Sequence, residues 1–497
     1  MAYPDWVLQH RQKGQEIKRI GTCYYLYEVS SFYDKEKKKT RKKSGTYLGR
    51  ITEDGFIPKG EAARPAIVRS VSVKEVGASN LVQETLTAEA AALTKHLPDY
   101  AQEILVCVIY RLLYQSSFKR MSWHHESSYL SETYPNLRLS GKQISEWLPK
   151  VGQMRDNLVA VMKELMDGEE LLLIDSTHIK TLSSNNVWAQ LGYNSQQDFE
   201  PQVNLLFLFA HDQQMPIFYR CVAGNVREIR AMELTLKESG IQNSVLVSDK
   251  GFYSASNLAM LQQNKWQYVL PLRRNLAMCD YSPLQQGSKK GFDGFFMYQK
   301  RPIWYKVSPL DGEQAHQRLI LFFDERLKTS ETSDYLTRVS AKKEGYSLEQ
   351  FHEKEPLFGT LTVLTNTAQK DKEEQTIPST PKKVYEFLKS RNDIEQLNDS
   401  YKNVLRADVS YTQSDASMEA WHFINFLAIR AYYKIFAMLV SEELSERFSP
   451  SDLLLALQAK KKVKINDDWV DSEVPKKLND IINMCLKNKK QTHEHVT

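Results

Sequence analysis

The sequence has few cysteines, and none of them is placed to form a pair. Its 497 residues include five, none of which has a second cysteine or a histidine near it in the sequence. They are Cys23, Cys107, Cys221, Cys279 and Cys485. This scarcity argues against a disulfide framework and against a structural zinc site. We therefore expect reduced thiols.

The sequence also lacks a long apolar run and a recognisable secretory leader. No uninterrupted apolar stretch reaches the roughly 18 residues that suggest a membrane span. The first residues, Met1 to Trp6, contain no basic segment followed by an apolar one. A content of 42% hydrophobic and 26% charged residues is typical of a globular chain. We expect a cytoplasmic protein of two to four domains, since this length exceeds one hydrophobic core.

Positive charge is concentrated in one short segment. The formal net charge is +5, but residues 35–43 alone carry seven cations and one anion, so the rest of the chain is close to −1. Alternating residues on both sides of the run predict a β-hairpin or small sheet over 20–52, with the cations on its connecting loop. Such a segment suits a polyanion such as DNA, although a solvated loop is the alternative. The candidate DNA contacts are Lys37, Lys38, Lys39, Arg41, Lys42 and Lys43.

The periodicity of the remaining chain predicts an α/β protein. Residues 71–165 follow helical spacing, and a helix-turn-helix over 120–150 is one interpretation of them. From 171 to 272 the expected order is strand, strand, strand, helix, strand, helix, strand, which is that of the ribonuclease-H-like fold. A strand-rich stretch and two further helices follow. We predict the segments 1–70 (basic β), 71–165 (helical, DNA-binding), 166–275 (core), 276–378 (β-rich insertion), 379–445 (core, second part) and 446–497 (Lys-rich helical tail).

Three acidic residues suggest a metal site. Asp175 and Asp249 are each expected to end an apolar strand, where a lone carboxylate is most simply a turn residue. Glu395 is predicted on a helix over 381–402, capped by Thr380, on one edge with Arg391 and Lys402. Together the three carboxylates provide the oxygen ligands that Mg²⁺ or Mn²⁺ prefers. Two such ions, about 4 Å apart, support phosphoryl transfer.

The order of these acids resembles the catalytic triad of DDE transposases. The spacing Arg391, three residues, Glu395, six residues, Lys402 is similar to that of the insertion-sequence 4 superfamily of bacterial elements. That pattern has a tyrosine where this chain has Leu388, and Tyr385 lies one turn earlier. Further matching pieces are Asp175–Thr177, Gly224–Asn225, Asp249–Ser254 and a strand-rich insertion before the glutamate helix. The likeness covers about 166–440.

The resemblance implies a role for each residue. Asp175 is expected to bridge two metal ions, and Asp249 and Glu395 to bind one each. Arg391 and Lys402 are expected to contact DNA phosphates, although an ion pair with Glu395 is the alternative for Arg391. Two weaker candidates for DNA contact are Lys250, beside the second acid, and Trp304, which could stack on a base in a hairpin step or pack in the core.

The function that follows is a DNA transposase. The enzyme would bind the terminal inverted repeats of its element as double-stranded DNA, cleave each end and join the 3′-hydroxyls to target DNA. Handling two ends requires a dimer or a larger complex. Two alternatives stay open: a non-catalytic DNA-binding regulator derived from a transposase, and a plain Mg²⁺-dependent nuclease of the same fold.

Overall fold

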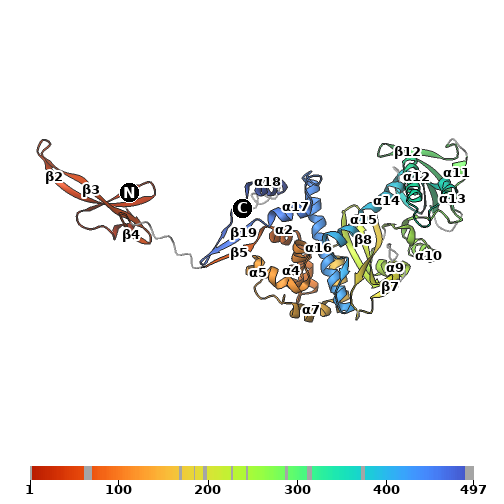
Figure 1. Ribbon diagram of the computed structural model, residues 1–497, viewed down its shortest axis with the longest axis horizontal. Coiled ribbons are helices and arrows are strands. Elements are labelled where there is room, and N and C mark those ends of the chain that lie inside the picture. Colours follow the sequence, from red (N-terminus) through yellow and green to blue (C-terminus); the bar gives the residue numbers. More distant parts are fainter. Residues whose placement is uncertain are drawn as a thin grey trace. The chain divides into compact units, whose positions relative to one another are not determined.

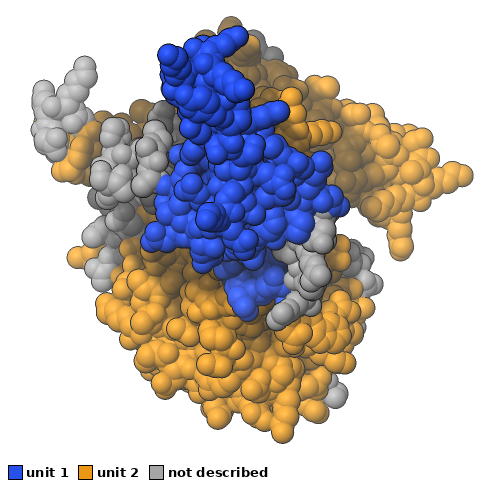
Figure 2. Space-filling view, turned by 90° about the vertical axis from the view of Figure 1, so that its left-hand side faces the viewer, with its two compact units in different colours: residues 1–72, 464–470 blue, residues 73–463, 471–497 orange. Residues whose placement is uncertain are grey.

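In the computed structural model, the contacts within the chain divide it into two units (Figure 2). The first contains residues 1–72 and 464–470, and the second contains residues 73–463 and 471–497. The structure describes residues 3–60, 70–166, 171–183, 185–193, 199–224, 228–241, 244–285, 289–310, 316–370 and 375–486. All five cysteines are free, as expected.

The first unit is built on an antiparallel sheet in the order β1-β2-β3-β4. Its elements are α1 (Asp5–Leu8), β1 (Gln15–Ile20), β2 (Cys23–Asp34), β3 (Lys39–Thr52) and β4 (Gly55–Pro58). A small core of Val7, Ile17, Leu26 and Ile51 supports one end of the sheet. Beyond that core, β2 and β3 continue as a two-stranded ribbon, from the pair Ser30–Lys43 to the pair Asp34–Lys39.

The predicted hairpin is present, but the placement of its cations was partly wrong. Lys37 and Lys38 lie in the turn between β2 and β3, whereas Lys39, Arg41, Lys42 and Lys43 belong to β3 itself. The ladder extends this far because β2 continues through Ser31, Phe32 and Tyr33, which supply hydrogen-bonding partners for the basic residues.

The second unit begins at residue 73, within a strand, and continues with a group of helices. These elements are β5 (Val71–Glu75), α2 (Gly77–Thr85), α3 (Thr87–His96), α4 (Ala101–Tyr114), α5 (Met121–Ser127), α6 (Leu130–Thr133), α7 (Gly141–Gln153) and α8 (Arg155–Glu164). Of these elements α2, α4 and α7 pack against α16 (Asp415–Ser441), which also contacts β9 (Figure 1). By length and composition α16 could cross a membrane, but 67% of its most apolar stretch is buried inside the molecule. It is therefore the core helix expected for this segment.

A large mixed sheet forms the centre of the second unit. Its first strands are β6 (Leu171–Thr181), β7 (Gln190–Tyr193), β8 (Phe199–Ala210), β9 (Met215–Ala223), β10 (Val245–Val247) and β11 (Gln267–Pro271). The helices α9 (Glu228–Ser239) and α10 (Ala255–Gln263) flank β10 in sequence. β6 pairs antiparallel with β8 and parallel with β10, and β10 pairs parallel with β11. The expected order of elements is confirmed, with β7 as an additional strand. Asn225 lies outside the described residues.

The prediction that Asp175 and Asp249 each end a strand was wrong. β6 continues through Asp175 to Thr181, because β8 is long enough to pair with it as far as Lys180. β10 ends at Val247, two residues before Asp249. Asp175 is thus a residue within a strand, whereas Asp249 follows one.

The strands of the expected insertion extend the central sheet. They are β12 (Gly294–Tyr298), β13 (Arg301–Pro309), β14 (Arg318–Phe323) and β15 (Thr360–Thr365), and β15 pairs antiparallel with β11. The short strands β16 (Ala368–Lys370) and β17 (Thr376–Pro378) form a separate hairpin. We predicted no helix here, but α12 (Glu325–Ser340) and α13 (Leu348–Lys354) are present. The Asp324 side chain caps α12 by accepting hydrogen bonds from the backbone amides of Arg326 and Leu327. An aspartate at this position is a sequence signal for the start of a helix.

The segment expected as one helix over 381–402 is divided. It forms α14 (Pro381–Lys389), α15 (Arg391–Asp399) and a π-helical turn, η4 (Ser400–Val404). Thr380 caps α14 as predicted. At the junction the Ser390 hydroxyl donates to the Phe387 carbonyl at 2.7 Å, a local bond that competes with the helical ladder.

The tail is helical only in part. α17 (Pro450–Leu457) and α18 (Lys476–Cys485) are separated by the strands β19 (Lys461–Ile465) and β20 (Asp468–Asp471). The run Lys460–Lys462 therefore leads into a strand, contrary to expectation, because Val463 and Ile465 alternate with lysines in a strand-like pattern. Lys487–Lys490 and residues 491–497 lie outside the described residues.

Candidate active site

Asp175 and Asp249 belong to the region where two neighbouring strands of the sheet run together. β6 and β10 are parallel, and Leu173 is paired with Val247, the last residue of β10. Asp175 lies two residues further along β6, and Asp249 lies two residues beyond the end of β10. The pairing of these strands therefore brings the two segments that carry the aspartates to the same edge of the sheet.

Helix α15 brings Glu395 to this position through an arginine. Arg391 Nη1 lies 3.1 Å from Asp249 Oδ1, and Arg391 Nη2 donates to Glu395 Oε1 at 2.7 Å. The arginine side chain is 19% exposed, whereas those of Asp249 and Glu395 are 44% and 55% exposed. One half-buried guanidinium therefore holds two solvent-facing carboxylates close together. The ion pair that we considered as an alternative for Arg391 is present.

The same helix also contacts the first acid. Asn398 Nδ2 donates to Asp175 Oδ2 at 2.9 Å, and α15 packs against β6 and β8. Asn398 follows Glu395 by three residues, so both lie on one edge of the helix. Asn398 is not among the residues predicted from the sequence, although a helical projection places it beside Glu395. Through Arg391 and Asn398, α15 links all three acids.

The three acids fit a divalent cation by their chemistry, but they are not closed around one. Hard carboxylate oxygens are suitable ligands for Mg²⁺ or Mn²⁺. Within the described parts of the chain, no group of three His, Cys, Asp or Glu side chains is close enough to hold a metal ion. The Arg391 guanidinium supplies the positive charge between two of the carboxylates. Binding of a metal by Asp249 and Glu395 together thus requires this guanidinium to give way.

Two half-buried lysines, Lys402 and Lys250, lie near the acids, and a third, Lys389, lies near Lys250 and Arg391. Burial lowers the pKa of Lys402, against the opposing effect of the Asp408 and Asp175 carboxylates. Burial also lowers the pKa of Lys250 and of Lys389, and the positive charge of Arg391 acts on both in the same direction. Lys389 was missed by the sequence analysis, because a lysine at the end of a helix is common. This collection of cations is suited to a polyanion.

The aromatic residues suggested by the resemblance are packed against other rings. Tyr385 is fully buried, with ring centroids of Phe296, Tyr298 and Phe322 at 5.5, 5.1 and 5.1 Å. Leu388 is also buried. Trp304 lies on β13 with its ring centroid 5.3 Å from that of Phe295 and 6.3 Å from that of Phe292.

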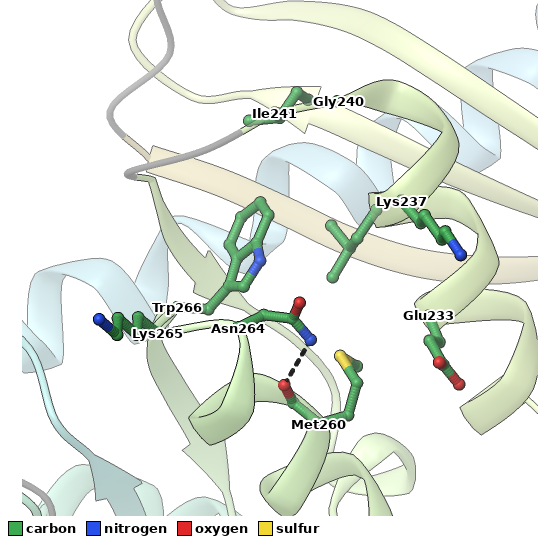
Figure 3. Close-up of a pocket in the computed structure, with 9 residues that line it drawn as sticks. Glu233, Lys237, Gly240, Ile241, Met260, Asn264, Lys265 and Trp266 are labelled. Atoms are coloured by element: carbon green, nitrogen blue, oxygen red, sulfur yellow. Dashed lines mark hydrogen bonds between the residues drawn. The ribbon is translucent and has the colours of Figure 1, made fainter.

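A separate cavity of about 570 Å³ lies between α9 and α10 (Figure 3). Glu233, Lys237, Met260 and Trp266 line it, and Asn264 Nδ2 donates to the Met260 carbonyl at 2.8 Å. None of the three acids is among the described residues that line this cavity. It contributes nothing to the site formed by α15.

The fold is α/β, and one helix contacts three acidic residues that lie on and beside the mixed sheet. Carboxylates of this kind are the ligands used in metal-dependent phosphoryl transfer. The chain belongs to the transposase DDE domain family, whose model matches residues 167–430. A solved structure, described as a piggyBac transposase synaptic complex with hairpin DNA, is similar over 76% of this chain and 70% of that chain, with 12% identity and a TM-score of 0.36. No curated protein matches the chain.

Proposed function

We propose that the protein is a DNA transposase of the insertion-sequence 4 type, with a ribonuclease-H-like core, that acts in the cytoplasm. It binds the terminal inverted repeats of its element as a dimer or larger complex, cleaves the element ends and joins them to target DNA. The observation that carries this proposal is the linkage of Asp175, Asp249 and Glu395 by Arg391 and Asn398 of α15. The three carboxylates are far apart in the sequence, and one helix makes a polar contact with each of them.

In this mechanism Asp175, Asp249 and Glu395 would hold two divalent cations, Mg²⁺ or Mn²⁺. Such ions activate an attacking oxygen and stabilise a leaving one. Arg391 and Lys402 contact the phosphates next to the scissile bond, and Arg391 leaves its carboxylate partners when it does so. Asn398 orients the Asp175 carboxylate by donating to one of its oxygens. Lys250 supplies a further phosphate contact, and Trp304 offers a ring for stacking if its neighbours separate.

The test is a nicking assay on DNA that carries the inverted repeats flanking the coding region. We expect Mg²⁺-dependent nicking by the wild type and a loss of about a thousandfold or more for Asp249→Asn, since charge stabilisation by metal ions provides several kcal/mol. Glu386→Gln is the matched control, because this carboxylate lies on α14 with 42% of its side chain exposed. Its nicking rate should equal that of the wild type.

The same assay separates the alternatives. Binding of the repeats without metal-dependent nicking would identify a regulator and overturn the proposal. Nicking without a joined product in a strand-transfer assay would identify a plain nuclease. Retention of nicking by Asp249→Asn, with unchanged thermal stability, would show that this carboxylate is not part of the site.

A further inference from the structure

A second cavity lies in the second unit, where α7 meets the segment that leads into α16. Its volume is about 860 Å³, within the range typical of ligand sites. It is lined by cations and aromatic rings, among them Lys119, Lys142, Arg406, Phe118, Tyr411 and Trp421. Among the described residues that line it there is no aspartate or glutamate. The proposed mechanism uses none of these residues.

The walls of this cavity are held in place by buried hydrogen bonds. Arg111, which is 3% exposed, donates to Asn425 Oδ1 at 2.9 Å, to the Leu405 carbonyl at 2.7 Å and to the Ser116 carbonyl at 2.8 Å. These bonds fasten the chain after η4 to α4 and α16. On the other wall, Ser140 begins α7 with a reciprocal capping box. The shape of the cavity is thus fixed by several hydrogen bonds and does not depend on a single surface side chain.

The rim of the cavity carries three exposed cations, Lys119, Lys142 and Arg406. Among the described residues, none of their side chains makes an ion pair. An anion bound here would face these cations and no acid among the described lining residues. The cavity therefore favours a negatively charged ligand.

The aromatic residues add a second requirement. The Tyr411 side chain is 69% exposed, and its hydroxyl and ring make no contact with another described aromatic residue or hydrogen-bonding partner. Trp421 and Phe118 contribute further apolar surface to the cavity. Rings and cations together are the features with which proteins bind single nucleotides of DNA, because bases stack on the rings while phosphates pair with the cations.

We propose that this cavity receives one unstacked nucleotide of the bound DNA, with its base against Tyr411 and its phosphate at Lys142 and Arg406. The inference rests on the proposed function, because it takes DNA as the ligand.

The position of the cavity agrees with a contact to the bound DNA. Val409, which lines the cavity, pairs with Lys180 of β6 through β18 (Val409–Ser410). Lys180 is five residues beyond Asp175, or about 16 Å along the strand, which corresponds to roughly five base-pair steps of a duplex.

The experiment uses the full chain and a duplex oligonucleotide with one bulged 2-aminopurine, a base that is already unpaired and hence costs little to extrude. Stacking on Tyr411 should quench its fluorescence. We expect Tyr411→Ala to abolish the quenching and to weaken binding roughly 5- to 100-fold. Tyr411→Phe, which keeps the ring, should behave as the wild type. An abasic bulge should bind wild type and Tyr411→Ala equally.

The phosphate contact is tested separately. The double variant Lys142→Ala, Arg406→Ala should reduce the salt dependence of binding by about 0.7 in log–log slope, the value for one neutralised phosphate of unpaired DNA. Lys150→Ala is the matched control, since Lys150 is exposed on α7 but does not line the cavity. Equal quenching by wild type and Tyr411→Ala, or an equal slope for the double variant and Lys150→Ala, would overturn the proposal.

This result can be distinguished from failure of the proposed function. Asp249→Asn should keep the full quenching signal, because Asp249 does not line the cavity. A wild-type protein that quenches 2-aminopurine but nicks no DNA would contradict the transposase mechanism and support the nucleotide cavity. A protein that nicks DNA without Tyr411-dependent quenching would do the opposite.

Discussion

At the scale of single residues, Arg391 has two roles that exclude each other. It pairs with Asp249 and Glu395 in this structure, whereas the proposed chemistry needs both carboxylates for metal ions and the guanidinium for DNA. A guanidinium cannot be deprotonated near neutral pH, so only a movement of the side chain can release the carboxylates. Metal binding and the Arg391 ion pairs must therefore compete.

This competition makes a prediction about Arg391→Ala. Because the competing cation is removed, the variant should bind Mn²⁺ about two- to fivefold more tightly, the range expected for partly exposed ion pairs. Electron paramagnetic resonance of free Mn²⁺ measures this affinity without any DNA. Affinity for DNA should fall in the same variant. Arg274→Ala is the control, since Arg274 pairs with Glu331 and not with the three acids. Weaker Mn²⁺ binding by Arg391→Ala would contradict the prediction.

The order and spacing of Asp175, Asp249 and Glu395 in the sequence make them candidates for the site, and this assignment stays a prediction. Their present contacts could not be predicted. The sequence contains no information on which rotamer an arginine adopts without metal, since that depends on distances across the fold. Asn398 was missed for a related reason: an amide attracts attention only when its partner, here Asp175, is known.

At the scale of secondary-structure elements, the first turn of α15 is fastened to the central sheet. His211, in the turn after β8, lies with Nδ1 at 2.6 Å from Asp393 Oδ2. The Asp393 carboxylate raises the pKa of His211 above its ordinary value. This contact holds the helix that carries Glu395, so its strength affects the site.

The stability contributed by this pair should depend on pH. Since the pKa of His211 is raised on folding, the contribution is complete below the unfolded value of about 6.5 and is lost as pH rises through the folded value. A double-mutant cycle with His211→Gln and Asp393→Asn should give a coupling of about 0.5 kcal/mol at pH 5.5, since both side chains are partly exposed. At pH 9 the coupling should be close to zero. An equal coupling at both pH values would contradict the assignment of His211 as the charged partner.

The division of the helix over 381–402 shows what periodicity cannot predict. Ile394, Leu397 and Tyr401 follow helical spacing, and all three are buried. The π-helical turn after Ser400 depends on tertiary contacts, among them the hydrogen bond of Tyr401 with the buried His422 at 2.8 Å. A pattern of 3.6 residues per turn contains no such information. The angle of Lys402 relative to Glu395 was therefore only approximately predictable.

At the scale of the whole molecule, buried charges connect the helices before the sheet to the core. Arg155 of α8 pairs with Glu419 of α16 and with Glu238 of α9, both at 2.6 Å, and Tyr219 donates to Glu419. The Glu419 side chain is 5% exposed. Arg155 and Glu419 are more than 260 positions apart in the sequence. This separation explains why the ion pairs could not be predicted from the sequence.

Glu419→Gln should destabilise the second unit strongly. It removes the buried negative charge that pairs with Arg155, although the glutamine oxygen can still accept from Tyr219. Loss of one charged partner from a buried ion pair typically costs about 3 kcal/mol. Tryptophan fluorescence during urea unfolding measures the effect as a lower transition midpoint. Glu446→Gln, an exposed carboxylate beyond the end of α16, is the control and should leave the midpoint unchanged. A midpoint for Glu419→Gln equal to that of the control would show that this network does not hold the helices to the core.

The division into two units assigns the local positive charge to the β2–β3 ribbon of the first. The lysines of β3 are exposed and lie outside the small core of that unit. Successive strand residues point to opposite faces, so Lys39, Arg41 and Lys43 share one face while Lys42 lies on the other. A two-stranded ribbon is narrow enough to enter the major groove of DNA. The charged face with three cations is the one we expect to contact phosphates.

This expectation is tested by Lys39→Gln, Lys43→Gln as a double variant. If both lysines contact phosphates, the log–log salt slope of binding to duplex DNA should fall by about 1.8, or 0.9 for each contact. The matched control is Lys13→Gln, Lys59→Gln, which removes the same charge from exposed sites of the first unit outside the ribbon and should leave the slope unchanged. Equal slopes for the two double variants would mean that the ribbon contributes only net charge. Nicking at saturating DNA should be equal in both, because the three acids belong to the second unit.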